Sequence, residues 1–306
     1  MDHVLEVENA SKSYKGNRVL TDVSMTINKG DIYGFVGKNG AGKTTLIRIV
    51  SGLINADSGE YRLFGTSSRT KDILKERRKV CAMVEAPAIY PELSAADNMK
   101  MQCIITGKAF TGIHGLLEFV GLENTGKKPS KDFSLGMRQR LGIAMSLVNE
   151  PELMLLDEPI NGLDPEGIKQ IRELLLKMNK EKGITILISS HILTELSLFA
   201  TRFGFIDKGS MIKEATIDDI KNETSNTCVV RTTDDTRASE LLKELGYTVN
   251  PDHGGLHVDT DIDLMRVCDV FKNNGVSLIK HEIGAVDLEG YFMNLIGGNR
   301  DEIIQG

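Results

Sequence analysis

The stretch GKNGAGKTT, residues 37–45, constrains the fold more than any other part of this sequence. It matches the pattern G-x-x-x-x-G-K-[ST] and lies between a strand-like apolar segment, IYGFV, and a helix-like segment, TLIRIV, which is the setting that a phosphate-binding loop requires. The glycines let backbone N–H groups surround an anion, and the helix N-terminus adds the positive end of its dipole. We expect Lys43 to reach the β- and γ-phosphates of a nucleotide and the Thr44 hydroxyl to ligate Mg²⁺. The predicted binding loop comprises Gly37, Lys38, Asn39, Gly40, Ala41, Gly42, Lys43, Thr44 and Thr45.

A second apolar segment, ELMLLDEP, ends in two carboxylates, Asp157 and Glu158. Near a phosphate loop, Asp157 is expected to hold Mg²⁺ directly or through water. Glu158 would then be the general base that orients and polarises the attacking water. Many strands end in acidic residues, so this pair is informative only because the phosphate loop accompanies it. Together the two motifs predict nucleotide hydrolysis.

Apolar segments and helical patterns alternate along the first two thirds of the chain. Short apolar runs and turns fill the first 65 residues, helical patterns run from 93 to about 149, and apolar strands return on either side of a helix at about 165–181. Strands that return after helices with wholly apolar centres indicate a mostly parallel sheet covered on both faces. We therefore predict an α/β core of the P-loop NTPase class, with an antiparallel β N-terminal part and a helical insertion.

The character of the sequence changes near residue 222. The segments CVVRTT, ASELLKELG, YTVN, LHVDT, LMRVCDVFKNNG and SLIKHEI give the order strand, helix, strand, strand, helix, strand, and a last helix follows. That order is the split βαβ arrangement. We predict a nucleotide-binding domain at 1–222, with a helical subdomain at about 86–150, and a small α+β accessory domain at 223–306.

Composition limits the other functions open to this chain. With 43 acidic against 37 basic residues among 306, the net charge is −6, and we predict no nucleic-acid partner. No apolar run approaches the roughly 20 residues that cross a bilayer, so no direct membrane insertion is predicted. MDHVLEVENA lacks the basic and apolar regions of a signal peptide.

The four cysteines show no CxxC pair, so we predict free thiols in a reducing compartment. We interpret Asp252, His253 and His257 as part of an exposed hairpin rather than a metal site.

Two further stretches narrow the class of phosphate-loop protein. FSLGMRQRLGIA begins a helix with Ser134 as N-cap and Gly136 close behind, and so presents a hydroxyl and backbone N–H groups to an anion. ILISSHILTE places His191 just past an apolar strand, at the sheet edge where open α/β sheets bind ligands. Taken alone, the first stretch is most simply a helix cap and the second a structural histidine.

The order and spacing of these motifs indicate one family of phosphate-loop proteins. Phosphate loop, S-x-G helix start, apolar strand with DE, NGLD and strand-end histidine together resemble the nucleotide-binding subunit of ATP-binding cassette (ABC) transporters, over residues 1 to about 220. The resemblance implies ATP and Mg²⁺ as ligands and hydrolysis of ATP to ADP and phosphate. It also implies a head-to-tail pairing, as a homodimer or with a paired ABC subunit, in which each ATP lies between one chain's loop and the other chain's Ser134–Gly136 segment.

The same resemblance adds three roles to the site. It implies that Tyr14, in SKSYKG, stacks on adenine. It implies that the segment from Asn161 to Asp164 acts across the dimer. His191 would contact the γ-phosphate and take part in catalysis with Glu158.

The sequence departs from the family at two places. Where members usually carry L-S-G-G-Q, this chain has F-S-L-G-M at 133–137, so the Ser and the second Gly are kept while a Leu and a Met replace a Gly and a Gln. Where the turn after CAMV usually begins with a Gln that touches Mg²⁺ and the attacking water, this chain has Glu85. An oxygen ligand is kept, and a negative charge is added near the γ-phosphate. The predicted metal ligands are therefore Thr44, Glu85 and Asp157.

Glu85, FSLGMRQRLGIA, NGLDPEGI, SSHIL and the closing LEGYFMNLIGG together resemble the ABC subunits that export bacitracin and lantibiotics for self-immunity or resistance. This resemblance implies integral membrane permease subunits as partners, with a helix of such a subunit docking beside the turn at 85–93. It implies a cytoplasmic chain, peripheral on the inner face of the cell membrane through the permease subunits.

Two alternatives stay open. The alternative nearest to a bacitracin or lantibiotic exporter is an exporter of another hydrophobic small molecule. From a different class, a soluble non-transport ABC ATPase could act as a switch on a ribosome or DNA. Such proteins commonly carry two cassettes or a long coiled coil, whereas this sequence has one phosphate loop and no heptad run. For residues 223–306 we predict a dimer-contact or regulatory role.

Overall fold

The computed structural model describes residues 2–224, 228–252, 255–258, 262–283 and 288–303. The chain divides into two compact units, Met1–Glu214 and Ala215–Gly306. The boundary expected near residue 222 falls inside helix α8 (Ile217–Thr224). Helix α8 is thus the first helix of the second unit.

A six-stranded sheet organises the larger unit, in the order β10-β9-β3-β8-β7-β6. The pairs β3–β8, β3–β9, β6–β7 and β7–β8 are parallel. Every residue of β3, β7 and β8 is buried, as expected for a sheet covered on both faces. The prediction of a mostly parallel sheet is confirmed. The strands are β3 (Ile32–Val36), β6 (Val80–Met83), β7 (Leu153–Asp157), β8 (Thr185–Ser190), β9 (Arg202–Asp207) and β10 (Ser210–Thr216).

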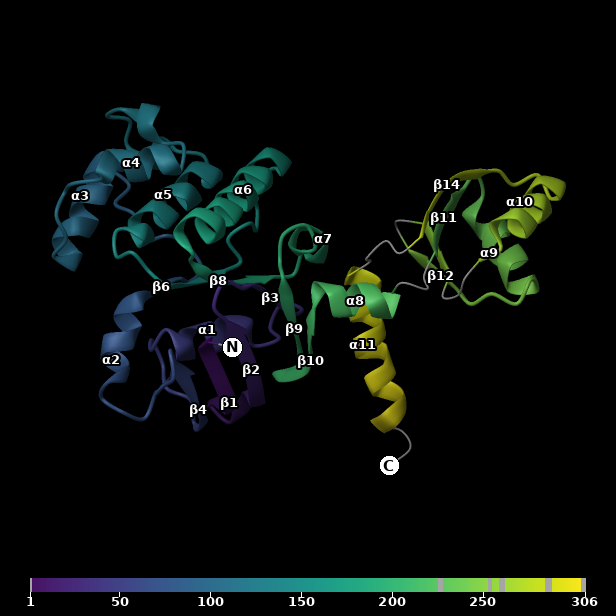
Figure 1. The fold of residues 1–306 in the computed structure, drawn as a ribbon, viewed down its shortest axis with the longest axis horizontal. Helices are drawn as coiled ribbons and strands as arrows, with labels where there is room; N and C mark the ends of the chain where they lie inside the picture. Colours follow the sequence, from purple (N-terminus) through teal and green to yellow (C-terminus); the bar gives the residue numbers. More distant parts are fainter. Residues whose placement is uncertain (1, 225–227, 253–254, 259–261, 284–287, 304–306) are drawn as a thin grey trace. The chain divides into compact units, whose positions relative to one another are not determined.

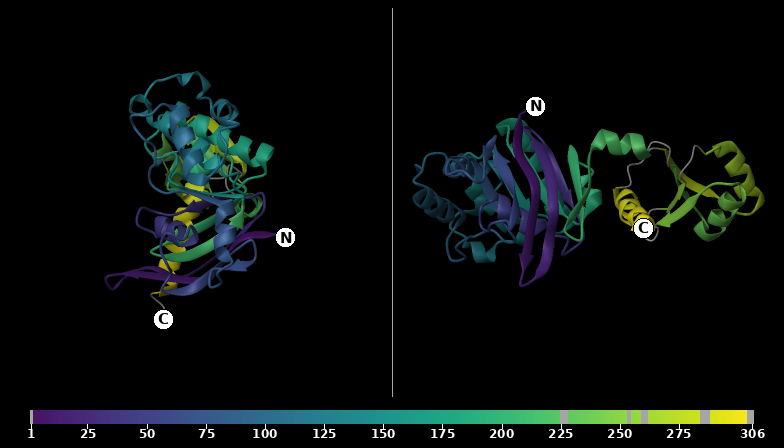
Figure 2. Two further views of the ribbon diagram at one scale, coloured as in Figure 1. Left: turned by 90° about the vertical axis from the view of Figure 1, so that its left-hand side faces the viewer. Right: turned by 90° about the horizontal axis from the view of Figure 1, so that it is seen from below.

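A second, antiparallel sheet in the order β2-β1-β4-β5 precedes and partly interrupts this core in sequence. Its apolar face shares one buried cluster with helix α1 and with Leu153 and Leu155 of β7. The antiparallel sheet and α1 therefore cover one face of the six-stranded sheet. Figure 2 (right) shows β1 and β2 as a long purple pair. The elements are β1 (His3–Tyr14), β2 (Asn17–Asn28), α1 (Lys43–Val50), β4 (Ser58–Leu63) and β5 (Thr66–Ser67).

Helices cover the other face. In Figure 1, α3, α4, α5 and α6 lie on the opposite side of the six-stranded sheet from β1, β2 and β4. Gly142, in the middle of α5, lets the helix pack closely against the turn after β6, because an added Cβ would lie 2.4 Å from Pro87 Cβ. The helices are α2 (Ile73–Glu76), α3 (Ala95–Thr106), α4 (Ile113–Phe119), α5 (Leu135–Leu147), α6 (Pro165–Lys182) and α7 (Leu193–Leu196), with 3-10 turns at Arg77–Lys79, Glu123–Thr125 and Ser130–Asp132.

The smaller unit has the predicted order of elements, β11-α9-β12-β13-α10-β14. Its sheet runs β12-β13-β11-β14 with antiparallel pairs, and α9 and α10 share its apolar core. The predicted small α+β fold is confirmed. The elements are β11 (Cys228–Thr232), α9 (Asp235–Glu244), β12 (Val249–Asp252), β13 (Gly255–Val258), α10 (Leu264–Asn273), β14 (Leu278–Ile283) and α11 (Leu288–Ile303).

Four further findings concern the cysteines, the expected hairpin, metal ligands and membrane spans in the residues that the structure describes. The four cysteines are free, and burial raises the pKa of the Cys81 and Cys228 thiols. Asp252 and Gly255 pair in the hairpin of β12 and β13, whereas His253 lies outside the described residues. Within the described ranges, no group of three or more His, Cys, Asp or Glu side chains could hold a metal. In the same ranges, no helix combines the length and apolarity needed to span a bilayer.

Candidate nucleotide-binding site

The register of four parallel strands brings the predicted site to one edge of the sheet. Val36, the last residue of β3, pairs with Ser190 of β8. Asp157, the last residue of β7, pairs with Ser189, and Met83 of β6 pairs with Leu156. The segments that leave these strands therefore start side by side, at the carboxyl edge where open α/β sheets bind ligands.

The phosphate loop leaves β3 and enters α1 through glycines that cannot be replaced freely. A Cβ on Gly37 would lie 2.5 Å from the carbonyl oxygen of Ile206. Gly42 has φ +108°, and its Cβ would meet Leu20 at 2.5 Å. The loop borders a cavity of about 180 Å³ whose lining includes Lys43 and Glu158. A pocket ringed by loop amides and a lysine is suited to phosphate groups.

Lys43, Glu158 and His191 form one polar chain across this edge. Lys43 Nζ lies 3.1 Å from Glu158 Oε1, and His191 Nδ1 lies 2.8 Å from Glu158 Oε2. Lys43 is almost fully buried, and Glu158 is one-fifth exposed. An incoming phosphate therefore has to compete with the Glu158 carboxylate for Lys43. A carboxylate released from Lys43 would keep its contact with His191.

Thr44 and Asp157 make the second contact of the site. Thr44 Oγ1 donates to Asp157 Oδ2 at 2.7 Å, and Ser189 Oγ donates to Asp157 Oδ1 at 2.7 Å. Asp157 is buried, so both of its oxygens are fixed. A hydroxyl and a carboxylate are oxygen donors of the kind that Mg²⁺ prefers, and nucleotide phosphates and water complete such sites. The donor set therefore fits Mg²⁺.

Ser189 was not among the predicted site residues, yet it contacts both carboxylate residues. Besides its bond to Asp157, its Oγ accepts a hydrogen bond from the backbone N–H of Glu158 at 3.0 Å. Its position two residues before His191, in ILISSH, was the only signal available. The pairing of β7 with β8 was needed to show that Ser189 faces Asp157.

We expect Ser189→Ala to lower the catalytic rate about tenfold and to lower the melting temperature, because each buried group left without a partner costs roughly 1–3 kcal/mol. Steady-state phosphate release and thermal unfolding measure the two effects. Ser190→Ala is the matched control: Ser190 is equally buried, but its Oγ accepts from the Ile192 N–H. If both variants lose the same activity, Ser189 serves only strand stability.

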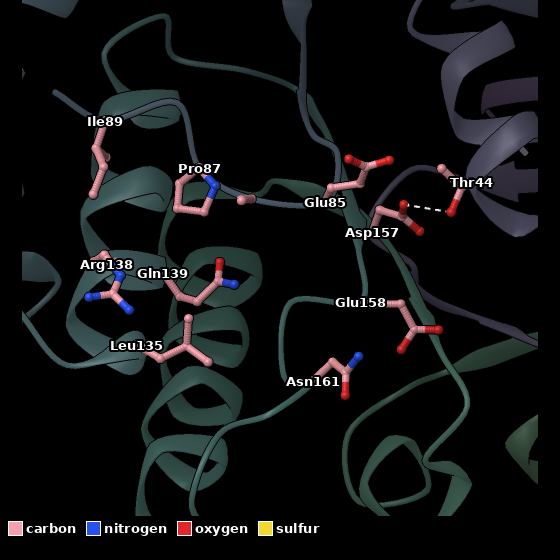
Figure 3. A pocket seen from close by; sticks show the side chains of 11 residues that line it. Thr44, Glu85, Pro87, Ile89, Leu135, Arg138, Gln139, Asp157, Glu158 and Asn161 are labelled. Atoms are coloured by element: carbon pink, nitrogen blue, oxygen red, sulfur yellow. Dashed lines mark hydrogen bonds between the residues drawn. The ribbon is translucent and has the colours of Figure 1, made fainter. Parts of the chain in front are cut away.

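A larger cavity of about 430 Å³ opens on the other side of Thr44 and Asp157. Figure 3 shows that the turn after β6, helix α5 and the end of β7 all contribute to it. Gln139, from α5, is 4% exposed, and its Oε1 has no hydrogen-bond partner among the described residues. The lining residues are Thr44, Glu85, Ala86, Pro87, Ile89, Leu135, Arg138, Gln139, Asp157, Glu158 and Asn161.

Glu85 reaches this region from the turn after β6. Its backbone is left-handed, with φ +65°, and its carboxylate is paired with the guanidinium of Arg48 on α1. It borders the same cavity as Thr44 and Asp157, the two residues with which it was predicted to share a metal ion. Arg48 was not among the predicted residues.

The remaining predicted residues lie at two helix starts, in the turn after β7 and at a strand end. Ser134 caps α5, accepting from the Met137 N–H at 3.2 Å, and Gly136 follows in its first turn. Asp164 caps α6, accepting from the Gly167 N–H at 3.1 Å. Asn161 borders the larger cavity. Tyr14, two-fifths exposed, ends β1 and is not among the residues that line the two cavities.

Comparison with known proteins places these features in a family context. Residues 20–161 match the family model described as ABC transporter. The chain is 37% identical to the bacitracin transport ATP-binding protein BcrA of Bacillus licheniformis, covering 97% of this chain and 99% of that one. It is 45% identical to the lantibiotic transport ATP-binding protein SrtF of Streptococcus pyogenes, over 72% of this chain and 93% of that one. The solved structure of cbiO1 from Clostridium perfringens, part of an ABC transporter complex, matches with 27% identity and a TM-score of 0.66, covering 80% of this chain and 98% of that one.

Proposed function

Because this chain belongs to the ABC transporter family, we propose that it is the ATP-hydrolysing subunit of an exporter, and that it splits ATP into ADP and phosphate. The observation that carries the proposal is the contact of Glu158 with both Lys43 and His191, beside the Thr44–Asp157 pair. A base, a phosphate-binding cation and oxygen donors then lie at one sheet edge, as the hydrolysis of a nucleotide phosphate requires.

Each residue of the site has a distinct task in this proposal. The amides of residues 37–45 hold the phosphates, and Lys43 leaves Glu158 to bind the β- and γ-phosphates. Glu158 orients a water molecule and takes its proton, while His191 keeps the carboxylate in place and contacts the γ-phosphate. Tyr14 would stack on the adenine.

Mg²⁺ would be held by Thr44 and Asp157, with Glu85 as an additional oxygen ligand, and when bound it supplies positive charge that offsets the phosphates. Ser189 fixes Asp157 for this purpose through the 2.7 Å hydrogen bond.

We propose that two such chains, or this chain and a paired ABC subunit, act head to tail. Ser134 is exposed at the start of α5, where its hydroxyl and the helix N-terminus can meet the phosphates held by the other chain. Asn161 and Asp164 would act across the same contact. We also propose that residues 223–306 contribute to dimer contacts or regulate closure.

The transported substrate in this proposal is an antimicrobial peptide of the bacitracin or lantibiotic type, in self-immunity or resistance. Support comes from the relatives named for bacitracin and lantibiotic transport. Permease subunits would hold the chain at the inner face of the membrane. The cavity beside Pro87 and Ile89 suits the docking of a permease helix that brings a hydrogen-bond donor, since Gln139 Oε1 has no hydrogen-bond partner among the described residues.

The experiment is to isolate the chain from its host by an affinity tag, in detergent, together with any bound membrane protein, and to reconstitute the complex in lipid vesicles. We expect ATP hydrolysis to rise at least twofold with bacitracin or a lantibiotic. A response only to other hydrophobic compounds would replace the substrate class. Recovery with ribosomes or DNA, and with no membrane protein, would favour the soluble switch over an exporter.

A further inference from the structure

Arg48 is the residue that contacts the unusual carboxylate of this site. Its Nη2 donates to Glu85 Oε1, although the two residues lie in different segments, the end of α1 and the turn after β6. Arg48 follows Thr44 by four positions on α1, so both side chains lie on the same side of that helix, one turn apart. Arg48 thus leaves α1 on the same side as Thr44, whose hydroxyl is proposed to ligate Mg²⁺.

The Glu85 carboxylate lies near Thr44, so its contact with Arg48 bears on metal binding. Figure 3 shows the carboxylates of Glu85 and Asp157 near Thr44, at one end of the larger cavity. Asp157 is fixed there by Thr44 and Ser189. Glu85 is fixed instead by a cation, Arg48. One carboxylate is therefore presented to the metal position, while the other is bound to a competing positive charge.

Exposure indicates that this ion pair can exchange. The Arg48 side chain is 37% exposed and the Glu85 side chain 68% exposed. Ion pairs between side chains this exposed contribute little to stability, because water solvates both partners almost as well. An ion pair that contributes little to stability and lies next to a cation site can hold a carboxylate until a cation replaces the arginine. A divalent cation carries twice the charge of a guanidinium and attracts the same carboxylate more strongly.

We propose that Arg48 is a positioning residue that holds the Glu85 carboxylate and competes with the divalent cation for it. The inference rests on the proposed function, since it concerns the cation that accompanies ATP. It predicts that Glu85 binds the cation only when nucleotide and cation are both present. It also predicts that a neutral residue at position 48 removes the competition between arginine and cation for Glu85.

The test is a double-mutant cycle read by cation binding rather than turnover. All proteins carry Glu158→Gln, which blocks hydrolysis in the proposed mechanism. Binding of Mn²⁺ in the presence of saturating ATP is measured by electron paramagnetic resonance for the parent, Arg48→Gln, Glu85→Gln and the double variant. We expect Arg48→Gln to tighten Mn²⁺ binding about fivefold, and the same change to alter binding less than twofold once Glu85 is Gln. Arg78→Gln, at an exposed arginine of the 3-10 turn before β6, is the matched control for lost surface charge.

Two outcomes overturn the proposal. Equal tightening in both backgrounds means that Arg48 acts only through its charge and not through Glu85. No change in either background means that the ion pair is a surface contact. Melting temperatures identify any variant that fails to fold. If Arg48→Gln is that variant, Arg48→Met, which is also neutral, is measured in its place with the same expected fivefold tightening and the same dependence on Glu85. ATP binding by the parent is checked separately, and its absence would overturn the proposed function itself.

Discussion

A protein carrying Glu158→Gln is expected to lose ATP hydrolysis by about 10²- to 10⁴-fold, the range that a positioned general base contributes. Glutamine keeps the size of the side chain and a hydrogen bond to His191, but it cannot accept the proton of the attacking water. Binding of ATP should be kept or become tighter, because Glu158 no longer competes for Lys43, which lies 3.1 Å from its Oε1.

Phosphate release at saturating ATP and equilibrium binding of a fluorescent ATP analogue separate these two effects. Glu181→Gln, at the exposed end of α6, is the matched control for loss of one carboxylate. A Glu158→Gln protein that hydrolyses ATP as fast as the wild type would remove the proposed base. Weaker ATP binding in that protein would instead mean that Glu158 helps to bind the nucleotide.

The parts of this site that the sequence predicted are those fixed by local geometry. The glycine pattern of residues 37–45 specifies a loop that few other backbones can form, since Gly42 requires a positive φ and Gly37 has no room for a Cβ. Strands with wholly apolar centres specify a sheet covered on both faces, and residues at their ends then meet at one edge. This reasoning places Asp157, Glu158 and His191 at one edge of the sheet, whereas the role expected for His191 came from the resemblance to the family.

The contacts that the sequence did not predict depend on how segments meet across the fold. Ser189 faces Asp157 only because β7 and β8 pair in one register, and nothing in ILISSH marks that register. Arg48 contacts Glu85 because the end of α1 approaches the turn after β6. A basic residue in the last turn of a helix is common, because it complements the helix dipole. Nothing in the sequence therefore indicated that Arg48 also contacts Glu85.

The N-terminal sheet shows the same limit in the fold. Its strands β1 and β2 each span 12 residues, whereas the apolar runs in the sequence are much shorter. Register shifts between Val7 and Ala10 and again near Lys12 interrupt the alternation of apolar and polar residues. A pattern with period two therefore breaks into pieces that appear to be separate short strands.

Lys43→Ala is expected to weaken ATP binding about 100-fold, since it removes a charge-assisted contact with the phosphates worth roughly 1.5–3 kcal/mol. Equilibrium binding of a fluorescent ATP analogue measures this loss. Lys29→Ala, at an exposed lysine outside the site, controls for the loss of one positive charge. Affinity of Lys43→Ala within threefold of the wild type would contradict the assignment of residues 37–45 as the phosphate site.

Lost stability is the competing explanation for weaker binding, because Lys43 is 5% exposed and the variant leaves Glu158 without its cationic partner. An ion pair broken on one side in a buried setting can cost several kcal/mol. The double variant Lys43→Ala, Glu158→Gln separates the two causes, since it removes the stranded carboxylate as well. We expect it to recover melting temperature but not ATP affinity. Recovery of both would mean that Lys43 acts by stabilising the site, and that the loop amides and the dipole of α1 alone bind the phosphates.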